Sequence, residues 1–182
     1  MGRVLTKSVK MLILTMMSIF VLSATAAVYY SLEITSTVTT AANDIYFVEG
    51  TDNATAGVTI FNDNKSSTLA QLKAYPNITM TYDDPLKVRN NNTGTNHNVR
   101  LTPVSLVGNA ANFVFINFTL QTSTKISLNY TSNGVSWTTP IQTSFAQVDA
   151  DQEYSIVVQT MANATAAADQ TATIEINVDV EM

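Results

Sequence analysis

The chain contains no cysteine and one histidine, and each scarcity excludes a class of chemistry. Without cysteine there is no disulfide framework, no thiolate metal site and no thiol nucleophile. The single histidine, His97, lies in an asparagine-rich segment, and we expect it to be a solvated loop residue that builds neither a nucleophile–base site nor a multi-histidine metal site within one chain. We therefore predict that the protein is not an enzyme and holds no cofactor.

Charge is also scarce, because only 13% of the residues are Asp, Glu, Lys or Arg. Three of the nine basic residues, Arg3, Lys7 and Lys10, lie at the extreme N-terminus. Removal of residues 1–26 would leave 182 − 26 = 156 residues with a net charge of (9 − 3) − 14 = −8. An acidic surface with scattered basic groups argues against nucleic acid or anionic lipid as a partner.

What the N-terminus does contain is the pattern of a secretory signal peptide. The three basic residues precede an uncharged run, Met11–Leu22, which is followed by the small residues of 23–27. A basic start, an apolar stretch and a small-x-small tail are typical of a cleavable export signal. Ala24-Thr25-Ala26 predicts cleavage after Ala26, so we expect a secreted, extracellular protein with no membrane association after cleavage.

The residues after the predicted cleavage site change to a period of two. Val28, Tyr30, Leu32 and Ile34 alternate with more polar neighbours, which predicts a half-buried strand over Val28–Thr35. A terminal strand with no hairpin partner before it is free to pair with another subunit. We therefore divide the chain into a signal peptide (1–26), an N-terminal donor strand and connector (27–38), and a β-sandwich domain (39–182).

The rest of the chain consists of short alternating or apolar segments separated by turn-forming residues. Asn112–Gln121 is apolar on both faces, and Ala172–Met182 alternates over its whole length. About nine or ten such segments predict an all-β sandwich of Greek-key or jelly-roll type. Local predictions within it are a short helix at Thr68–Ala74, a strand end at Asp83-Asp84-Pro85, a solvated loop at Arg89–Asn98 and a tight turn at Asn133-Gly134.

Seven Asn-x-Ser/Thr sequons could carry glycans in an exported protein. We interpret Asn117 as unmodified, because it lies within an apolar strand. The remaining candidates are Asn53, Asn64, Asn77, Asn91, Asn129 and Asn163.

One acidic group has the oxygen-rich composition that Ca²⁺ prefers. It comprises Asp149, Asp151 and Glu153 at alternate positions, but it lacks the glycine and the distant glutamate of an EF-hand loop. We therefore favour a turn and a solvated strand start over a metal site.

The layout as a whole resembles that of a known family. A signal peptide, then AVYYSLEITSTV as the new N-terminal strand, then a cysteine-free, Thr/Asn-rich β domain is similar to the archaeal bundling-pilus subunits. It is more distantly similar to the TasA-like matrix fibre proteins of bacterial biofilms. The resemblance implies a head-to-tail homopolymer, in which each donor strand (here Val28, Tyr30, Leu32 and Ile34) enters the sandwich of the next subunit. It also implies lateral bundling into extracellular filaments that support adhesion or biofilm.

Two alternatives remain open from the sequence. Residues 11–32 are long enough to stay as a membrane helix of a type IV-like pilin or surface protein. The chain could instead be a secreted monomeric carbohydrate-binding or adhesive module whose first strand folds back onto its own sheet. Burial of four apolar donor residues contributes roughly 6–12 kcal/mol, whereas association costs about 4–15 kcal/mol, so a filament also needs backbone pairing.

Overall fold

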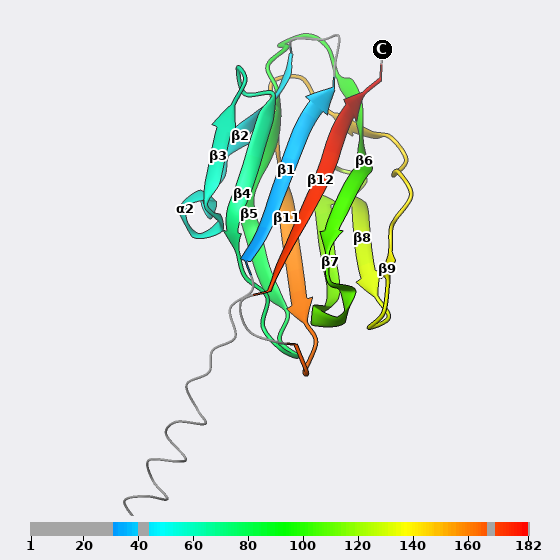
Figure 1. Cartoon of the computed structure of the whole chain (residues 1–182). Coiled ribbons are helices and arrows are strands. Elements are labelled where there is room, and N and C mark those ends of the chain that lie inside the picture. The colour runs from blue at the N-terminus through cyan, green and yellow to red at the C-terminus, as the bar shows by residue number, and fades with distance from the viewer. Residues whose placement is uncertain (1–30, 40–43, 167–169, 182) are drawn as a thin grey trace, which may run out of the picture.

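The protein is a sandwich of two β-sheets, as the sequence predicts (Figure 1). The computed structural model describes the backbone of residues 31–39, and both backbone and side chains of residues 44–166 and 170–181. These residues form twelve strands, more than the nine or ten expected, with a four-residue α-helix, α2 (Asn53–Ala56), and a short 3₁₀ turn, η1 (Ala110–Asn112).

Each sheet contains six strands. Sheet A has the order β10 (Ala146–Val148), β6 (His97–Gly108), β12 (Thr171–Val180), β1 (Ser31–Thr39), β4 (Ser66–Leu72), β3 (Val58–Phe61). Sheet B has the order β2 (Ile45–Glu49), β5 (Met80–Asn90), β11 (Glu153–Ala162), β7 (Phe113–Leu120), β8 (Ile126–Ser132), β9 (Trp137–Thr138). Among these strands, β1 and β12 form the one parallel pair; the other pairs are antiparallel.

The core lies between the sheets and is filled by alternate side chains of their strands. Ile174 and Val178 of sheet A are fully buried, as are Ile116 and Leu120 of sheet B. Burial of each such side chain contributes about 1.5–3 kcal/mol. The period-two pattern therefore correctly identified the buried face of β12. For β7, however, the expectation of a strand covered on both sides is wrong: Ile116 and Leu120 are buried, whereas Phe115 on the opposite face is only half-buried, because a two-layer sandwich covers one face of each sheet.

The helix predicted at Thr68–Ala74 is wrong, because this segment forms β4. Leu69 and Leu72 are both buried at a spacing that resembles one face of a helix. The spacing arises from a β-bulge: Leu72 pairs with Leu32 and Leu69 pairs with Ile34, so Ala70 and Gln71 together oppose one residue of β1. A bulge thus gives a strand the i, i+3 pattern of a helix.

The strand end predicted at Asp83-Asp84-Pro85 is also wrong, because β5 continues through these residues to Asn90. Leu86 pairs with Ile156 and Tyr82 with Val158, so the three residues bulge opposite Val157. The amides of Asp83 and Asp84 instead donate to Oδ2 of Asp52, at 2.9 and 3.1 Å. Proline is tolerated here because a bulge already interrupts the ladder.

A hairpin does form around Asn133-Gly134, but its turn differs from the predicted one. Gly134 has φ = 85°, whereas Asn133 is not among the residues with positive φ. The loop spans the four residues 133–136, and Asn133 Oδ1 accepts hydrogen bonds from the amides of Val135 (2.9 Å) and Ser136 (2.8 Å). Asn133 therefore stabilises the turn through its side-chain oxygen, and its backbone is not in the left-handed region.

The described residues contain no helix long and apolar enough to cross a membrane. The predicted signal peptide, residues 1–26, lies outside them.

Candidate functional site: the slot between β4 and β12

The predicted donor strand falls partly within the described residues. Val28 and Tyr30 lie outside them, whereas Leu32 and Ile34 belong to β1. The strand continues to Thr39, because both neighbours still offer pairing partners beyond Thr35. Part of the predicted connector is therefore strand.

In the single chain, β1 fills a slot in the middle of its own sheet A. It pairs antiparallel with β4 on one side and parallel with β12 on the other, and these two strands do not pair with each other. Figure 1 shows β1 in blue beside β12 in red. We call the space between β4 and β12 the slot. Donation of β1 to a neighbour would require it to leave this position.

The slot is lined by apolar side chains that need a covering strand. Leu69, Leu72, Ile174, Ile176 and Val178 are each at most 2% exposed. An empty slot would open these apolar groups to water, at a cost of about 1.5–3 kcal/mol for each side chain fully exposed.

The register of β1 matches this lining. Leu32 lies beside Ala172 and opposite Leu72, and Ile34 lies beside Ile174 and opposite Leu69. The two predicted apolar positions that the structure describes are thus in register with buried positions on both walls.

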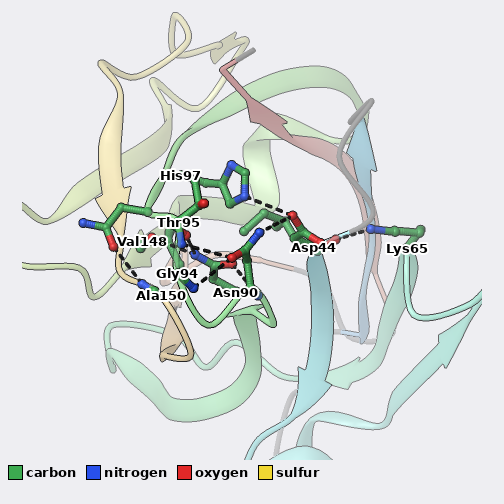
Figure 2. Close-up of polar contacts among 11 residues, drawn as sticks. Asp44, Lys65, Asn90, Gly94, Thr95, His97, Val148 and Ala150 are labelled. Atoms are coloured by element: carbon green, nitrogen blue, oxygen red, sulfur yellow. Dashed lines mark hydrogen bonds and ion pairs between the residues drawn. The ribbon is translucent and has the colours of Figure 1, made fainter.

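The link from β1 to sheet B ends in a tightly held residue, Asp44 (Figure 2). Its carbonyl oxygen accepts the amide of Asn91 at 2.8 Å, and its Oδ2 accepts Asn92 Nδ2 at 3.0 Å. Nε2 of His97 lies 3.4 Å from the same carboxylate oxygen. Lys65 Nζ donates to the carbonyl of the next residue, Ile45. Residues 40–43 alone therefore separate β1 from a fixed anchor.

The hydrogen bonds and charges around Asp44 favour the ionised form of its carboxylate. The hydrogen bond from Asn92 lowers the pKa of Asp44; burial opposes it, and His97 and Lys65 add to the lowering. Burial lowers the pKa of Lys65, and Asp44 opposes that shift. The carboxylate thus remains an acceptor for the asparagine-rich segment over the whole neutral range.

The asparagine-rich segment is more ordered than the predicted solvated loop. Residues 91–96 connect β5 to β6, while Asn90 is fully buried and donates from Nδ2 to the carbonyls of Thr95 (2.8 Å) and Val148 (3.2 Å). His97 was expected to be solvated, but its side chain is only 14% exposed. Asparagines spaced around Gly94 are typical of side-chain-capped turns, and that signal could have predicted this order.

The acidic group at 149–153 is divided among separate partners. Asp149 Oδ2 accepts the hydroxyl of Tyr154 at 2.7 Å, whereas Asp151 and Glu153 form ion pairs with Arg89 at 3.1 and 2.7 Å. Hydrogen bonds from Gln147 and Tyr154 lower the pKa of Asp149. Across the described part of the chain, no three His, Cys, Asp or Glu side chains gather closely enough to hold a metal ion.

The six candidate glycosylation sites differ in exposure. Asn64, Asn77, Asn91 and Asn129 are exposed, whereas Asn53 and Asn163 are half-buried. Asn129 lies within β8 and Asn53 begins α2; the others lie in loops.

No protein-family model and no curated protein matches this chain. The resemblance to bundling-pilus subunits thus remains a prediction from the sequence.

Proposed function

We propose that this protein is the structural subunit of an extracellular filament, in which β1 leaves its own slot and occupies the slot of the next subunit. The observation that carries the proposal is the position of β1. It is the first strand of the described chain, it fills the middle of sheet A, and residues 40–43 join it to the rest. Its removal would divide sheet A into β10–β6–β12 and β4–β3 without breaking any other strand pair.

The energetics of such an exchange are favourable only at sufficient concentration. A strand inserted in a neighbour would pair with the same two slot walls as it does in its own chain, so the contributions of this pairing nearly cancel. What remains is the cost of association, about 4–15 kcal/mol, against the contacts between subunit bodies. Head-to-tail insertion that does not close on itself yields a filament.

Cross-linking of single-cysteine variants tests the proposal directly, because the chain contains no cysteine of its own. Thr35 of β1 pairs with Thr68 of β4. We expect Thr35→Cys and Thr68→Cys chains, mixed and oxidised, to form a covalent dimer, because partners in register come within disulfide reach.

The matched control is Thr59→Cys on β3, which pairs with Thr68 and so lies one strand farther from β1. The cysteine at position 59 lies about 9–10 Å from β1 and should not cross-link to Thr35→Cys. A chain that carries both Thr35→Cys and Thr68→Cys and stays monomeric after oxidation at all concentrations would contradict strand exchange.

The second candidate is a secreted monomeric module, and the pairing of β1 within its own chain favours it. Electron microscopy of the purified protein at high concentration separates the two candidates, since isolated particles alone support the monomer. The membrane-helix alternative takes residues 11–32 as a helix, whereas Ser31 and Leu32 belong to β1. Sequencing of the mature N-terminus distinguishes this alternative, since a start near Ala27 eliminates the anchor.

A further inference from the structure

Four polar residues form a continuous row across the outer face of sheet B. The register pairs Thr81 with Gln159, Gln159 with Asn117, and Asn117 with Asn129, so β5, β11, β7 and β8 each contribute one member. Hydrogen bonds of 3.4 Å join Asn117 Nδ2 to Gln159 Oε1, and Gln159 Nε2 to Thr81 Oγ1. At the end of the row, Asn129 is exposed, and its carboxamide has no hydrogen-bond partner among the described residues. Its amide nitrogen is therefore available.

A hollow of about 410 Å³ lies beside this row. Phe115 and Val114 supply its apolar surface, and the carboxamides of Asn117, Asn129 and Gln159 supply neutral donors and acceptors. None of the described residues that line it is charged. An aromatic side chain offers a face for the C–H groups of a pyranose ring, and carboxamides can bind its hydroxyls. The hollow therefore has the chemistry of a site for a neutral sugar.

The same place carries a glycosylation sequon, Asn129-Tyr130-Thr131, and Phe115 lies directly opposite Thr131 in the register. We propose that Asn129 carries an N-linked oligosaccharide whose first sugar ring packs in this hollow against Phe115. The modification requires the export predicted from residues 1–26, but it does not depend on strand exchange.

The covalent step is an ordinary transfer from a lipid-linked oligosaccharide, catalysed by the oligosaccharyltransferase of the secreting cell. The amide nitrogen of Asn129 forms a bond to C1 of the sugar. The C1–O bond to the lipid phosphate or pyrophosphate breaks, and the phosphate leaves with the bonding electrons. The amide proton passes to a base of the transferase, so no oxidant or reductant takes part.

Three of the other sequons, at Asn117, Asn53 and Asn64, lack this combination of a free amide and a neutral hollow. Asn117 donates from Nδ2 to Thr119 Oγ1 and Gln159 Oε1, both at 3.4 Å, and Asn53 donates to Glu49 Oε2 at 2.6 Å. Asn64 borders a different hollow, but Glu49, Arg89 and Glu153 line that one, and Ser66 of its sequon is 5% exposed. A glycan at Asn64 would therefore contact charged side chains and not a row of neutral hydrogen-bond donors.

Glycopeptide mass mapping tests the assignment. The full chain is secreted from a eukaryotic host, in which the first sugar is N-acetylglucosamine. We expect Asn129 to be occupied and Asn117 to be bare in the folded, secreted protein. A bare Asn129 overturns the proposal, whether other sequons carry glycans or none does. Filament formation is measured separately by the cysteine cross-links, so failure of one proposal is distinguishable from failure of the other.

A double-mutant cycle tests the packing of the sugar on Phe115. Phe115→Ala should lower the Tm by about 2–4 °C more in the glycosylated protein than in the Asn129→Gln background, because only the glycosylated protein loses the ring contact. The control is Ile141→Ala, in a second hollow that Asn129 also borders. Equal effects of Phe115→Ala in both backgrounds, or a glycan-dependent effect of Ile141→Ala instead, would show that the sugar does not occupy the proposed hollow.

Discussion

Sheets A and B have the same number of strands, but they depend differently on the N-terminal part of the chain. The middle of sheet B is built from β5, β11 and β7, each connected at both ends to other strands of the described chain. The middle of sheet A contains β1 and β12, the first and last described strands. In the proposed exchange, β1 leaves sheet A without separating any other strand pair, whereas a central strand of sheet B cannot leave without unfolding its neighbours. In the proposed filament, sheet A is therefore the exchangeable sheet and sheet B the permanent one.

The strongest test of this difference is deletion of residues 27–39. We expect the variant to form no filaments and to lose amide protection in β4 and β12, because both slot walls lose their partner strand. Protection in β11 and β7 should remain higher, since their pairing does not involve β1. Hydrogen exchange and electron microscopy measure the two effects.

A synthetic peptide of residues 27–39 provides the control for this deletion. The peptide should restore protection in the slot walls, because it supplies the missing strand in trans. Fibres formed by the deletion variant without the peptide would show that assembly uses a different surface.

A pair of matched core substitutions separates stability from assembly. Leu69→Ala in the slot wall and Leu128→Ala in sheet B both truncate buried leucines, 2% and 0% exposed. Each should lower the free energy of unfolding by about 2–5 kcal/mol, measured by urea denaturation. The slot variant should also weaken filaments, seen as a higher protein concentration needed for assembly. If both variants shift assembly equally, the slot is not the acceptor.

The sequence predicted the sandwich but not the arrangement at the slot, and particular residues explain the difference. Ile174, Ile176 and Val178 alternate strictly, and local alternation is enough to identify a strand and its buried face. The parallel pairing of β1 with β12 joins residues at opposite ends of the chain, which no local pattern reports. Leu69 and Leu72 have the spacing of a helix face in the sequence because a β-bulge lies between them in the structure. The bulge forms against the neighbouring strand, so the local sequence does not reveal it.

The anchor at the end of the link was missed for a related reason. Asp44, Asn92 and His97 come together only once β2, β5 and β6 are in place. In the sequence, the asparagine-rich segment has the composition of a solvated loop, and its hydrogen bonds to Asp44 join residues more than forty positions apart. The turn geometry within residues 90–95 was predictable from the asparagines and the glycine of this segment. The residue to which the segment is hydrogen-bonded, Asp44, was not predictable.

The permanent sheet offers a smaller test at Tyr130. Its hydroxyl is buried without a hydrogen-bond partner among the described residues, and burial raises its pKa. Because an unsatisfied buried hydroxyl costs about 1–3 kcal/mol, Tyr130→Phe should raise the free energy of unfolding by about 1 kcal/mol. Urea denaturation measures the change, and assembly should be unaffected. A loss of stability would instead reveal a partner for the hydroxyl.

The smallest expected effect lies at Asp44, where the exchangeable strand meets the permanent sheet. The folded-state pKa of Asp44 is lowered, first by Asn92, from an ordinary value of 3.8. Its contribution to stability is therefore fully present above pH 3.8 and is lost as the pH falls through the lowered folded-state pKa. Wild type should have a higher Tm than Asp44→Asn at neutral pH, and the gap should close in acid. The comparison is made in a His97→Gln background, so that His97 does not contribute. A gap that persists in strong acid would mean that Asp44 anchors the link through its backbone carbonyl alone.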